Sequence, residues 1–406
     1  MSKSPVPLTL IFALALTMML GPFSLDTYLP AFPSIGSDLG VGPQAVALSV
    51  SVYIFTIAFS QLLGGAFSDR FGRRQILVTG LVVYTLASFL IAAAQGIEVM
   101  LGGRVVQAFG AGWVLVSVPA LVRDRVAGRE AAKLFSLIGF IMVCAPAVAP
   151  SIGNLLLQLG SWRFIFLSLA AYAIFLVPMT ARFIFRGLPT APRSPVSLGF
   201  LARYRSVLGR GPTFLFVVWQ SAGFSAMMIF VTNASFIYQD HFQQSETAFS
   251  MLFAANIVAM LGFLMLNRIL LSRMAPLHIL QMAASIQLLG MLGLVLASLG
   301  DWGVYAFVPP MMLTIGAMGA ISPNIQACYL EYFPESGGTA AALLGSFQFF
   351  CAGLLSAGST LLPQTLAAVV LAMVGCGVVC LLMLSASLVF RRKLLEPVPV
   401  LTQSAP

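Results

Sequence analysis

Charge is scarce in this sequence. Only 8% of its 406 residues are Asp, Glu, Lys or Arg, whereas 59% are hydrophobic. A soluble globular domain carries charge on about a quarter of its residues. The composition therefore excludes an ordinary soluble protein and indicates a chain that lies in lipid.

Cysteine and histidine are also few. The cysteines are odd in number and lie in or at the edge of apolar runs, so we expect no disulfide framework: Cys144, Cys328, Cys351, Cys376 and Cys380. Cys376 and Cys380 share a helix face, but no His or carboxylate accompanies them, which favours small apolar packing. His241 and His278 have no metal-like neighbours either. We expect no metal site and no cofactor.

The motifs of common membrane enzymes are missing. The sequence contains no His-Glu-x-x-His, Gly-x-Ser-x-Gly or P-loop pattern that would indicate a metal site, an activated nucleophile or a phosphate-binding loop. It also shows no selectivity filter or ring of charge of the kind that a channel needs. We therefore do not expect an enzyme, and we disfavour a channel.

Long apolar runs are what the sequence has instead. About 20 helical residues cross a ~30 Å hydrocarbon layer. Runs such as "LTLIFALALTMML" are apolar on every face, unlike the alternating strands of a β-barrel. Only Lys3 precedes the first run and no clear cleavage pattern follows it, so we expect it to be retained. We predict an all-α integral membrane protein with twelve transmembrane helices, at 6–33, 43–66, 74–95, 97–121, 134–157, 162–181, 212–238, 247–266, 276–299, 302–326, 338–361 and 365–390.

The basic residues are distributed asymmetrically between the predicted loops. If the N-terminus is cytoplasmic, every Lys and Arg except Arg104 and Arg163 lies on the cytoplasmic side. This bias predicts a multi-pass protein of a bacterial-type inner membrane with both termini cytoplasmic. The net charge of +9 therefore follows from membrane orientation, and we expect no nucleic-acid partner.

The longest polar interval, "RGLPTAPRSPVSLGFLARYRSVLGRGP", divides the chain near its middle. Many transporters consist of repeated halves with a substrate site between them near the membrane midplane. We predict an N-terminal six-helix bundle at 1–185, a cytoplasmic linker at 186–211, a C-terminal six-helix bundle at 212–391 and a cytoplasmic tail at 392–406.

Two charged residues interrupt the apolar runs: Asp26 in the first and Arg104 in the fourth. Ionisable residues inside a membrane are costly and usually functional. Counting along each helix places both about 10 Å below the outer surface, where contact is possible. A carboxyl group in a low dielectric holds its proton more firmly, and a nearby guanidinium opposes this, so helix movement can switch it. A salt bridge that only holds the bundle together is the alternative.

Further polar and aromatic residues in the spans are candidates for lining a central cavity. Amides also bridge membrane helices for packing, and most aromatic side chains in spans contact lipid or neighbouring helices, so both roles stay open. The predicted substrate-binding residues are Asp26, Tyr53, Trp113, Trp219, Asn233, Phe236, Asn256, Asn324 and Phe347.

The stretch "GAFSDRFGRR" concentrates charge between the second and third spans. Gly65 permits close helix approach, Gly72 permits a tight turn, and Asp69 can meet a helix N-terminus or an arginine. A merely basic turn that anchors the helices to anionic lipid is the alternative.

The pattern G-x-x-x-D-R-x-G-R-R of this stretch resembles the signature turn of the major facilitator superfamily, although Phe67 replaces the usual Leu and Ser68 a common Ala. Other segments are similar to the bicyclomycin-resistance (Bcr/CflA) subfamily of drug-proton antiporters: "LDTYLPAFP", "ALVRD", "CAPAVAPSIG", "SWRFIF", "FAANI" and "GGTAAALLGSFQF". In the fifth span, "APAVAP" departs from the antiporter motif G-P-x-x-G-G in a way that is similar to this subfamily.

The resemblance implies the major facilitator fold, with two pseudo-symmetric six-helix bundles. It implies proton coupling by Asp26, Arg104 and Gln107, the last two from an R-x-x-Q motif. It also implies that the signature turn acts as a latch, with the gating residues Gly65, Asp69, Arg70, Gly72, Arg73, Arg74, Arg123 and Asp124.

The function that follows from the resemblance is export of small amphipathic compounds, antibiotics among them, driven by protons. A proton-coupled importer or uniporter of a metabolite with the same fold is the alternative. We expect a monomer whose partners are a lipophilic or amphipathic small molecule and membrane lipid.

Overall fold

The computed structural model describes residues 7–125, 128–185, 213–300, 302–333 and 337–389, and every regular element in them is a helix. In the first half these elements are α1 (Leu8–Asp26), η1 (Leu29–Ala31), α2 (Phe32–Leu39), α3 (Pro43–Phe71), α4 (Arg73–Ala92), α5 (Ile97–Arg125), α6 (Gly128–Leu159), α7 (Arg163–Met179) and the π-helical turn η2 (Thr180–Ile184). In the second half they are α9 (Phe214–Ser235), the π-helical turn η4 (Phe236–His241), α10 (Glu246–Leu270), α11 (Pro276–Gly300), α12 (Val304–Gly316), α13 (Met318–Leu330), α14 (Gly337–Thr360) and α15 (Leu366–Val389).

These helices confirm the predicted fold class. Eleven helical runs in the described residues are long and apolar enough to cross a membrane, and the 32-residue helix α6 lies at the remaining predicted span. Large apolar side chains stay exposed on outward helix faces, as at Leu289, Leu292 and Leu371. Lipid, rather than water, is the solvent that suits such a surface.

The first crossing is not a continuous helix. It runs from Leu8 to Leu39, six residues beyond the predicted end, and it breaks after Asp26. Proline has no N–H, so Pro30 cannot donate to the carbonyl of Asp26 four residues earlier. Because of the break, the last carbonyl groups of α1 lack the N–H groups, four residues later, that a continuous helix would provide.

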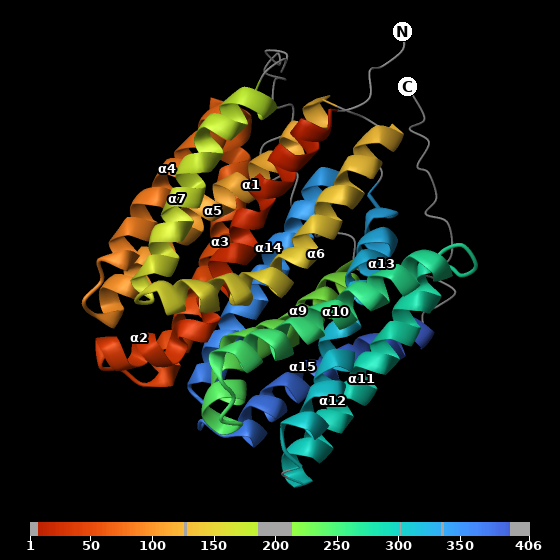
Figure 1. Cartoon of the computed structure of the whole chain (residues 1–406). Helices are drawn as coiled ribbons and strands as arrows, with labels where there is room; N and C mark the ends of the chain where they lie inside the picture. The colour runs from red at the N-terminus through yellow and green to blue at the C-terminus, as the bar shows by residue number, and fades with distance from the viewer. Residues whose placement is uncertain (1–6, 126–127, 186–212, 301, 334–336, 390–406) are drawn as a thin grey trace, which may run out of the picture.

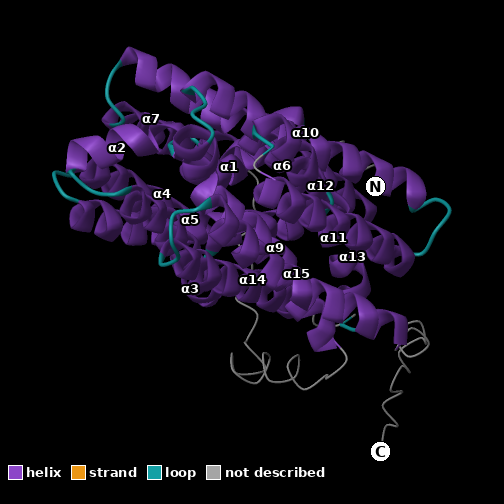
Figure 2. Ribbon diagram, turned by 90° about the horizontal axis from the view of Figure 1, so that it is seen from below, coloured by secondary structure: helices purple, strands orange, loops and turns teal. Residues whose placement is uncertain are grey.

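The helices form two groups that lie side by side (Figures 1 and 2). Helices α1 to α7 pack mainly against one another, as do α9 to α15, and the groups meet where α3 packs on α14 and α6 packs on α10. The division into two domains stays a prediction, because the 186–211 linker lies outside the described residues.

The hydrogen bonds between the two groups lie near one end of the molecule, where α2 ends and the chain turns into α3. In the described part of the chain they join Asn154 to Thr247 (3.1 Å), the Gln239 amide to the Pro30 carbonyl (3.3 Å), and Ser356 to Ser51 (2.9 Å). We call this the far end, since α1 starts and α15 stops at the opposite one. The two groups are thus held together at the far end.

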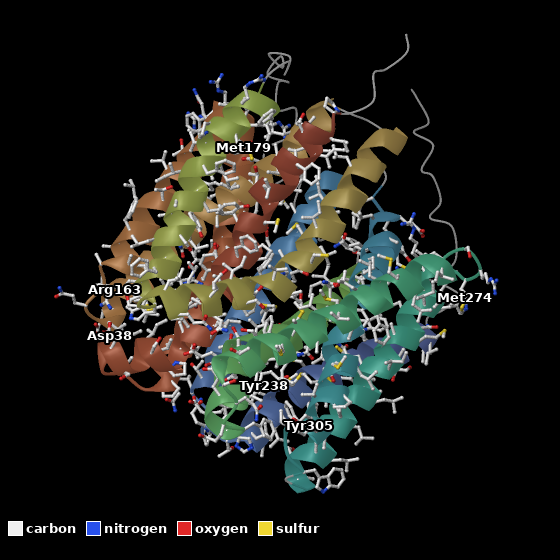
Figure 3. The ribbon with its side chains drawn as sticks, viewed as in Figure 1. Asp38, Arg163, Met179, Tyr238, Met274 and Tyr305 are labelled. Atoms are coloured by element: carbon white, nitrogen blue, oxygen red, sulfur yellow. The ribbon has the colours of Figure 1, made fainter. Side chains whose placement is uncertain are left out.

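A three-way clamp fixes the far end of the first group (Figure 3). Arg163 pairs with Asp38 of α2 and also donates to the Ala94 carbonyl at 2.8 Å. The indole N–H of Trp162 donates to Asp38 at 3.0 Å. These contacts join the turns beside α2, α4 and α7. Arg163, which the charge pattern placed on the outer side, therefore has a packing role.

Glycine allows the close approach of α6 to the broken first crossing. A Cβ atom at Gly153 would overlap the backbone carbonyl of Thr27. A Cβ atom at Gly262, on the helix α10, would meet no atom within 4 Å. The "PSIG" end of the predicted antiporter segment therefore packs directly against the residue that follows Asp26.

We expect Gly153→Ala to destabilise the protein by about 1–3 kcal/mol, because its methyl group must push α6 away from Thr27. Thermal unfolding of the detergent-purified protein, followed by tryptophan fluorescence, measures this as a lower Tm. Gly262→Ala is the matched control, and its Tm should stay equal or rise slightly. Equal Tm values for the two variants would contradict the packing role of Gly153.

Candidate functional site

The guanidinium of Arg104 is the centre of the candidate site. Arg104 lies on α5 and is 0% exposed. Its Nη1 atom donates to the Ser24 carbonyl at 3.0 Å and to Gln107 Oε1 at 2.7 Å. Its Nη2 atom donates to the hydroxyl of Tyr28 at 3.3 Å. All these acceptors are neutral, although the guanidinium keeps its charge under any physiological condition.

Two aromatic rings complete the surroundings of this cation. The central carbon of the Arg104 guanidinium lies 4.1 Å from the ring centroid of Tyr53 and 4.6 Å from that of Tyr28. Desolvated cation–π contacts of this kind contribute roughly 2 kcal/mol or more. The rings thus offset part of the cost of burying the charge.

The break in the first crossing explains why the Ser24 carbonyl is available. The helix α1 ends two residues later, at Asp26, so the carbonyl groups of its last turn accept from outside the helix. The negative end of the helix dipole lies in this last turn, and it favours a nearby cation. Arg104 therefore occupies a place that a continuous helix would not offer.

A hydroxyl network extends the site over four helices. The Tyr28 hydroxyl bonds Ser49 of α3 at 2.8 Å, and the Ser24 hydroxyl bonds Tyr84 of α4 at 2.5 Å. Gln107 donates to the Ser88 hydroxyl at 2.8 Å. The predicted partners Arg104 and Gln107 thus belong to one hydrogen-bonded cluster, which holds α1, α3, α4 and α5 together.

Asp26 lies beside this cluster without forming an ion pair in it. Its side chain is 6% exposed, and it comes two residues after the carbonyl that Arg104 contacts. Among the described residues, no ion pair or hydrogen bond involves its carboxylate. The structure therefore brings Asp26 and Arg104 to the same level, as predicted, but the possible direct contact is absent in this conformation.

The aromatic candidates lie at separate places. Tyr53 belongs to the Arg104 cluster. Trp113, on α5, packs against Phe67 of α3 with 6.0 Å between ring centroids. Trp219, on α9, is 0% exposed in the core of the second group. Phe347 contacts Phe214 at 6.1 Å.

The three asparagine candidates make hydrogen bonds inside the second group. Asn233 donates to Ser359 at 3.0 Å, Asn256 to the Tyr238 hydroxyl at 3.4 Å, and Asn324 to Asn267 at 2.6 Å. All three are at most 1% exposed. These contacts show the packing role that the sequence left open, and the substrate-binding role stays a prediction.

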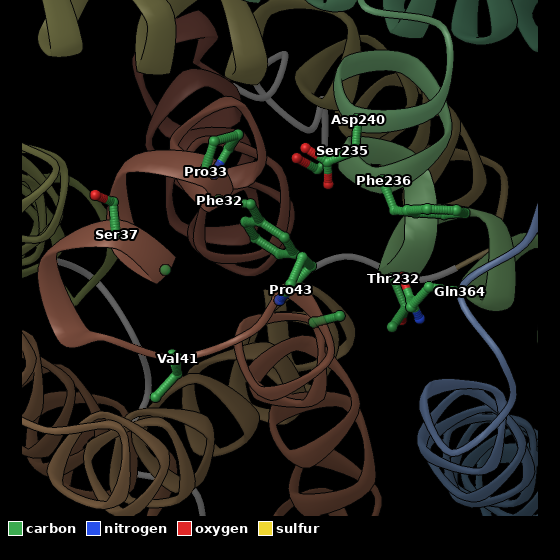
Figure 4. A pocket seen from close by; sticks show the side chains of 12 residues that line it. Phe32, Pro33, Ser37, Val41, Pro43, Thr232, Ser235, Phe236, Asp240 and Gln364 are labelled. Carbon is green, nitrogen blue, oxygen red and sulfur yellow. The ribbon is translucent and has the colours of Figure 1, made fainter.

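Phe236 lines a pocket. This pocket of about 250 Å³ lies at the far end between the two groups of helices (Figure 4). Its walls also include Asp240 and Thr232, which the sequence analysis did not select. The predicted seventh span stopped at residue 238, whereas the helical run continues through η4 to His241.

The signature stretch is mostly helical. The helix α3 continues to Phe71, and the turn consists of Gly72, whose φ of 96° confirms that glycine is needed there. The close helix approach predicted at Gly65 occurs at Gly64 instead, where a Cβ atom would lie 2.7 Å from Trp113. A Cβ atom at Gly65 would lie 3.9 Å from Val116, which is ordinary contact.

The predicted gating arginines lie around this turn. Arg70 lies over the ring of Phe71 at 5.3 Å, and Arg74 lies over the ring of Phe185 at 5.2 Å. Arg73 is the first residue of α4. The side chains of Asp69, Arg123 and Asp124 lie outside the described part of the structure, so their gating role stays a prediction.

The cluster also contains residues that the sequence analysis missed. They are the hydrogen-bonding partners Ser24, Tyr28, Ser49, Tyr84 and Ser88. The available signal was the presence of hydroxyl groups near the levels of Asp26 and Arg104 in otherwise apolar runs.

Comparison with known proteins gives consistent results. The family description "Major Facilitator Superfamily" matches residues 14–357. The bicyclomycin resistance protein homolog of Haemophilus influenzae is 30% identical over 381 residues, which cover 92% of this chain and 94% of that protein. The chloramphenicol resistance protein of Pseudomonas aeruginosa is 30% identical, with 88% of this chain and 86% of that protein covered.

The fold has close structural counterparts as well. A crystal structure of a POT family transporter in complex with 5-aminolevulinic acid superimposes with a TM-score of 0.77 and 14% identity, over 97% of this chain and 98% of that chain. The resemblance inferred from the sequence motifs is confirmed. This multi-pass membrane protein belongs to the Major Facilitator Superfamily, a family of transporters of small molecules.

Proposed function

We propose that the protein is a proton-coupled antiporter that exports small amphipathic compounds, antibiotics among them, by alternating access. The observation that carries the proposal is the buried Arg104 guanidinium, held by neutral groups beside an Asp26 carboxylate that has no described partner. The names of the two resistance proteins above favour export over the alternative of metabolite import.

In this proposal Asp26 carries the exchangeable proton. Its carboxylate has no ion-pair partner among the described residues, so it is available to a proton or to cargo in turn. Arg104 and Gln107 act as positioning residues, since they fix the end of α1 through the Ser24 carbonyl.

Alternating access requires that the two groups of helices separate at the far end. In the described part of the chain, the hydrogen bonds that join the groups there link neutral partners. The helices α3 and α14 also pack closely, because a Cβ atom at Gly353 of α14 would lie 2.5 Å from the Cα atom of Phe55 on α3. We infer that this conformation is closed at the far end and that export opens it.

The remaining features of the proposal concern the surroundings. The charge bias described above supports an inner membrane location with both termini cytoplasmic, so the far end faces outward. We propose that the protein acts as a monomer in lipid, that its cargo is lipophilic or amphipathic, and that the proton is its only coupling ion.

Asp26→Asn is the first test. Adding a transported drug to the purified wild-type protein at fixed pH should release protons, because cargo displaces the proton from Asp26. The variant should release none and should lose gradient-driven export, because an amide does not bind a proton. Glu331→Gln, which neutralises an exposed acid outside the spans, should behave like the wild type. Wild-type protein that releases no protons would count against the proposal.

Arg104→Lys tests the positioning role. Lysine keeps the charge but not the planar fork, so it cannot hold the Ser24 carbonyl, Gln107 and Tyr28 at once. We expect export, measured as drug efflux from energised vesicles, to fall more than about tenfold, which corresponds to about 1.4 kcal/mol. Full activity of the lysine variant would show that charge alone is sufficient.

Gly353→Val tests the closure of the far end. The larger side chain should push α14 from Phe55 and so favour separation of the two groups. The measurement is the distance distribution between spin labels on Ser37→Cys and Gln243→Cys, in protein whose native cysteines are replaced by serine. We expect a shift to longer distances. Gly358→Val on the same helix, where a Cβ atom meets nothing within 4 Å, should leave the distribution unchanged.

A further inference from the structure

The far-end pocket has features that the proposed function does not use. Its volume is about 250 Å³, and it lies between α2 and α3 of the first group and α9 and η4 of the second. Pro33, Ser37 and Pro43 line the pocket and are exposed, whereas Phe32 and Thr232 are buried in its wall. The pocket is therefore open to the outer surface and closed inside.

A carboxylate without a described partner is the main polar group of this pocket. Asp240 lies in the π-helical turn η4 and is partly buried. In the described structure, no hydrogen bond or ion pair involves its carboxylate, and no Lys or Arg is among the described residues that line the pocket. Figure 4 shows Asp240 and Phe32 on opposite walls. The pocket thus has a net negative charge.

Two further groups are suited to the same ligand. The Thr232 side chain is 1% exposed, and its hydroxyl has no hydrogen-bond partner among the described residues. The aromatic ring of Phe32 offers a surface that attracts cations. A carboxylate, an aromatic ring and a hydroxyl group without a described partner together favour a compact organic cation over a neutral or anionic compound.

We propose that this pocket binds a small organic ammonium ion at the outer face of the transporter. The Asp240 carboxylate neutralises the ammonium charge, Phe32 packs against its alkyl groups, and the Thr232 hydroxyl accepts from any N–H group. This site is distinct from the Arg104 cluster on α1, α3, α4 and α5, which shares none of its lining residues.

Binding here also stabilises the conformation described above. The walls come from both groups of helices, and the hydrogen bond from Gln239 to Pro30 joins the groups close to Asp240 in the chain. A ligand that contacts both walls binds better when the far end is closed, so it shifts the population to that state. Added from outside, such an ammonium ion acts as an inhibitor of the transport cycle.

Calorimetric titration of the purified full-length protein with tetraethylammonium tests the site. We expect saturable binding to the wild type and a loss of affinity of at least about tenfold in Asp240→Asn, since the counter-charge is lost. Thr232→Val, which is nearly isosteric, should leave tetraethylammonium binding unchanged, because this ion has no N–H group, but should weaken the binding of triethylammonium, which has one. Glu246→Gln removes an exposed carboxylate at the same end, outside the pocket, and should bind like the wild type.

The same titration separates this site from the proposed proton site. Asp26→Asn should bind tetraethylammonium with unchanged affinity, even if it has lost all export. Spin labels on Gln95→Cys and Gln243→Cys, which are exposed and lie outside the pocket lining, should report more of the short distance when tetraethylammonium is added to the otherwise native protein, but not to Asp240→Asn. The proposal is overturned if the wild type does not bind, if Asp240→Asn binds equally well, or if Asp26→Asn loses affinity as Asp240→Asn does.

Discussion

The structure depends on one buried positive charge. Arg104 is fully removed from solvent in the first group of helices, and an uncompensated ion in that position would cost several kcal/mol. The protein satisfies it with a backbone carbonyl, an amide, a phenol and two aromatic rings instead of a carboxylate. This solution requires that α1 end where it does. Asp26 is the last residue of this helix, two residues after the carbonyl that Arg104 contacts, and among the described residues no ion pair involves its carboxylate.

The described hydrogen bonds within the first half include charged groups, whereas those between the halves join neutral groups. The Arg104 cluster and the Arg163 clamp tie several helices of the first group together through charged hydrogen bonds. Between the groups, the described hydrogen bonds join neutral partners such as Ser51 and Ser356, each worth about 0.5–1.5 kcal/mol net. Two groups of helices joined by such hydrogen bonds can change their relative orientation when the binding free energy of a ligand favours the new orientation.

The sequence predicted the membrane spans and the two intramembrane charges because both depend on composition and helix rise alone. It could not predict which atoms Arg104 contacts, since the rotation of one helix against another depends on tertiary packing. For the same reason the sequence left the role of Asn324 open, because its hydrogen-bond partner Asn267 lies on another helix. Hydropathy also ended the seventh span at residue 238, because Gln239 and Asp240 are polar, and so it missed the far-end pocket.

The π-helical turn at the end of α9 has a consequence for how Asp240 is oriented. A π turn contains one residue more than an α turn, and successive residues of an α-helix are about 100° apart around the axis. Rewinding η4 into an α turn would therefore rotate the residues beyond it by roughly that angle. Asp240, the fifth residue of η4, would turn by part of that angle relative to Thr232 of α9, without any rigid-body movement of the helix. A local change of helical pitch would thus move the Asp240 charge relative to the pocket wall.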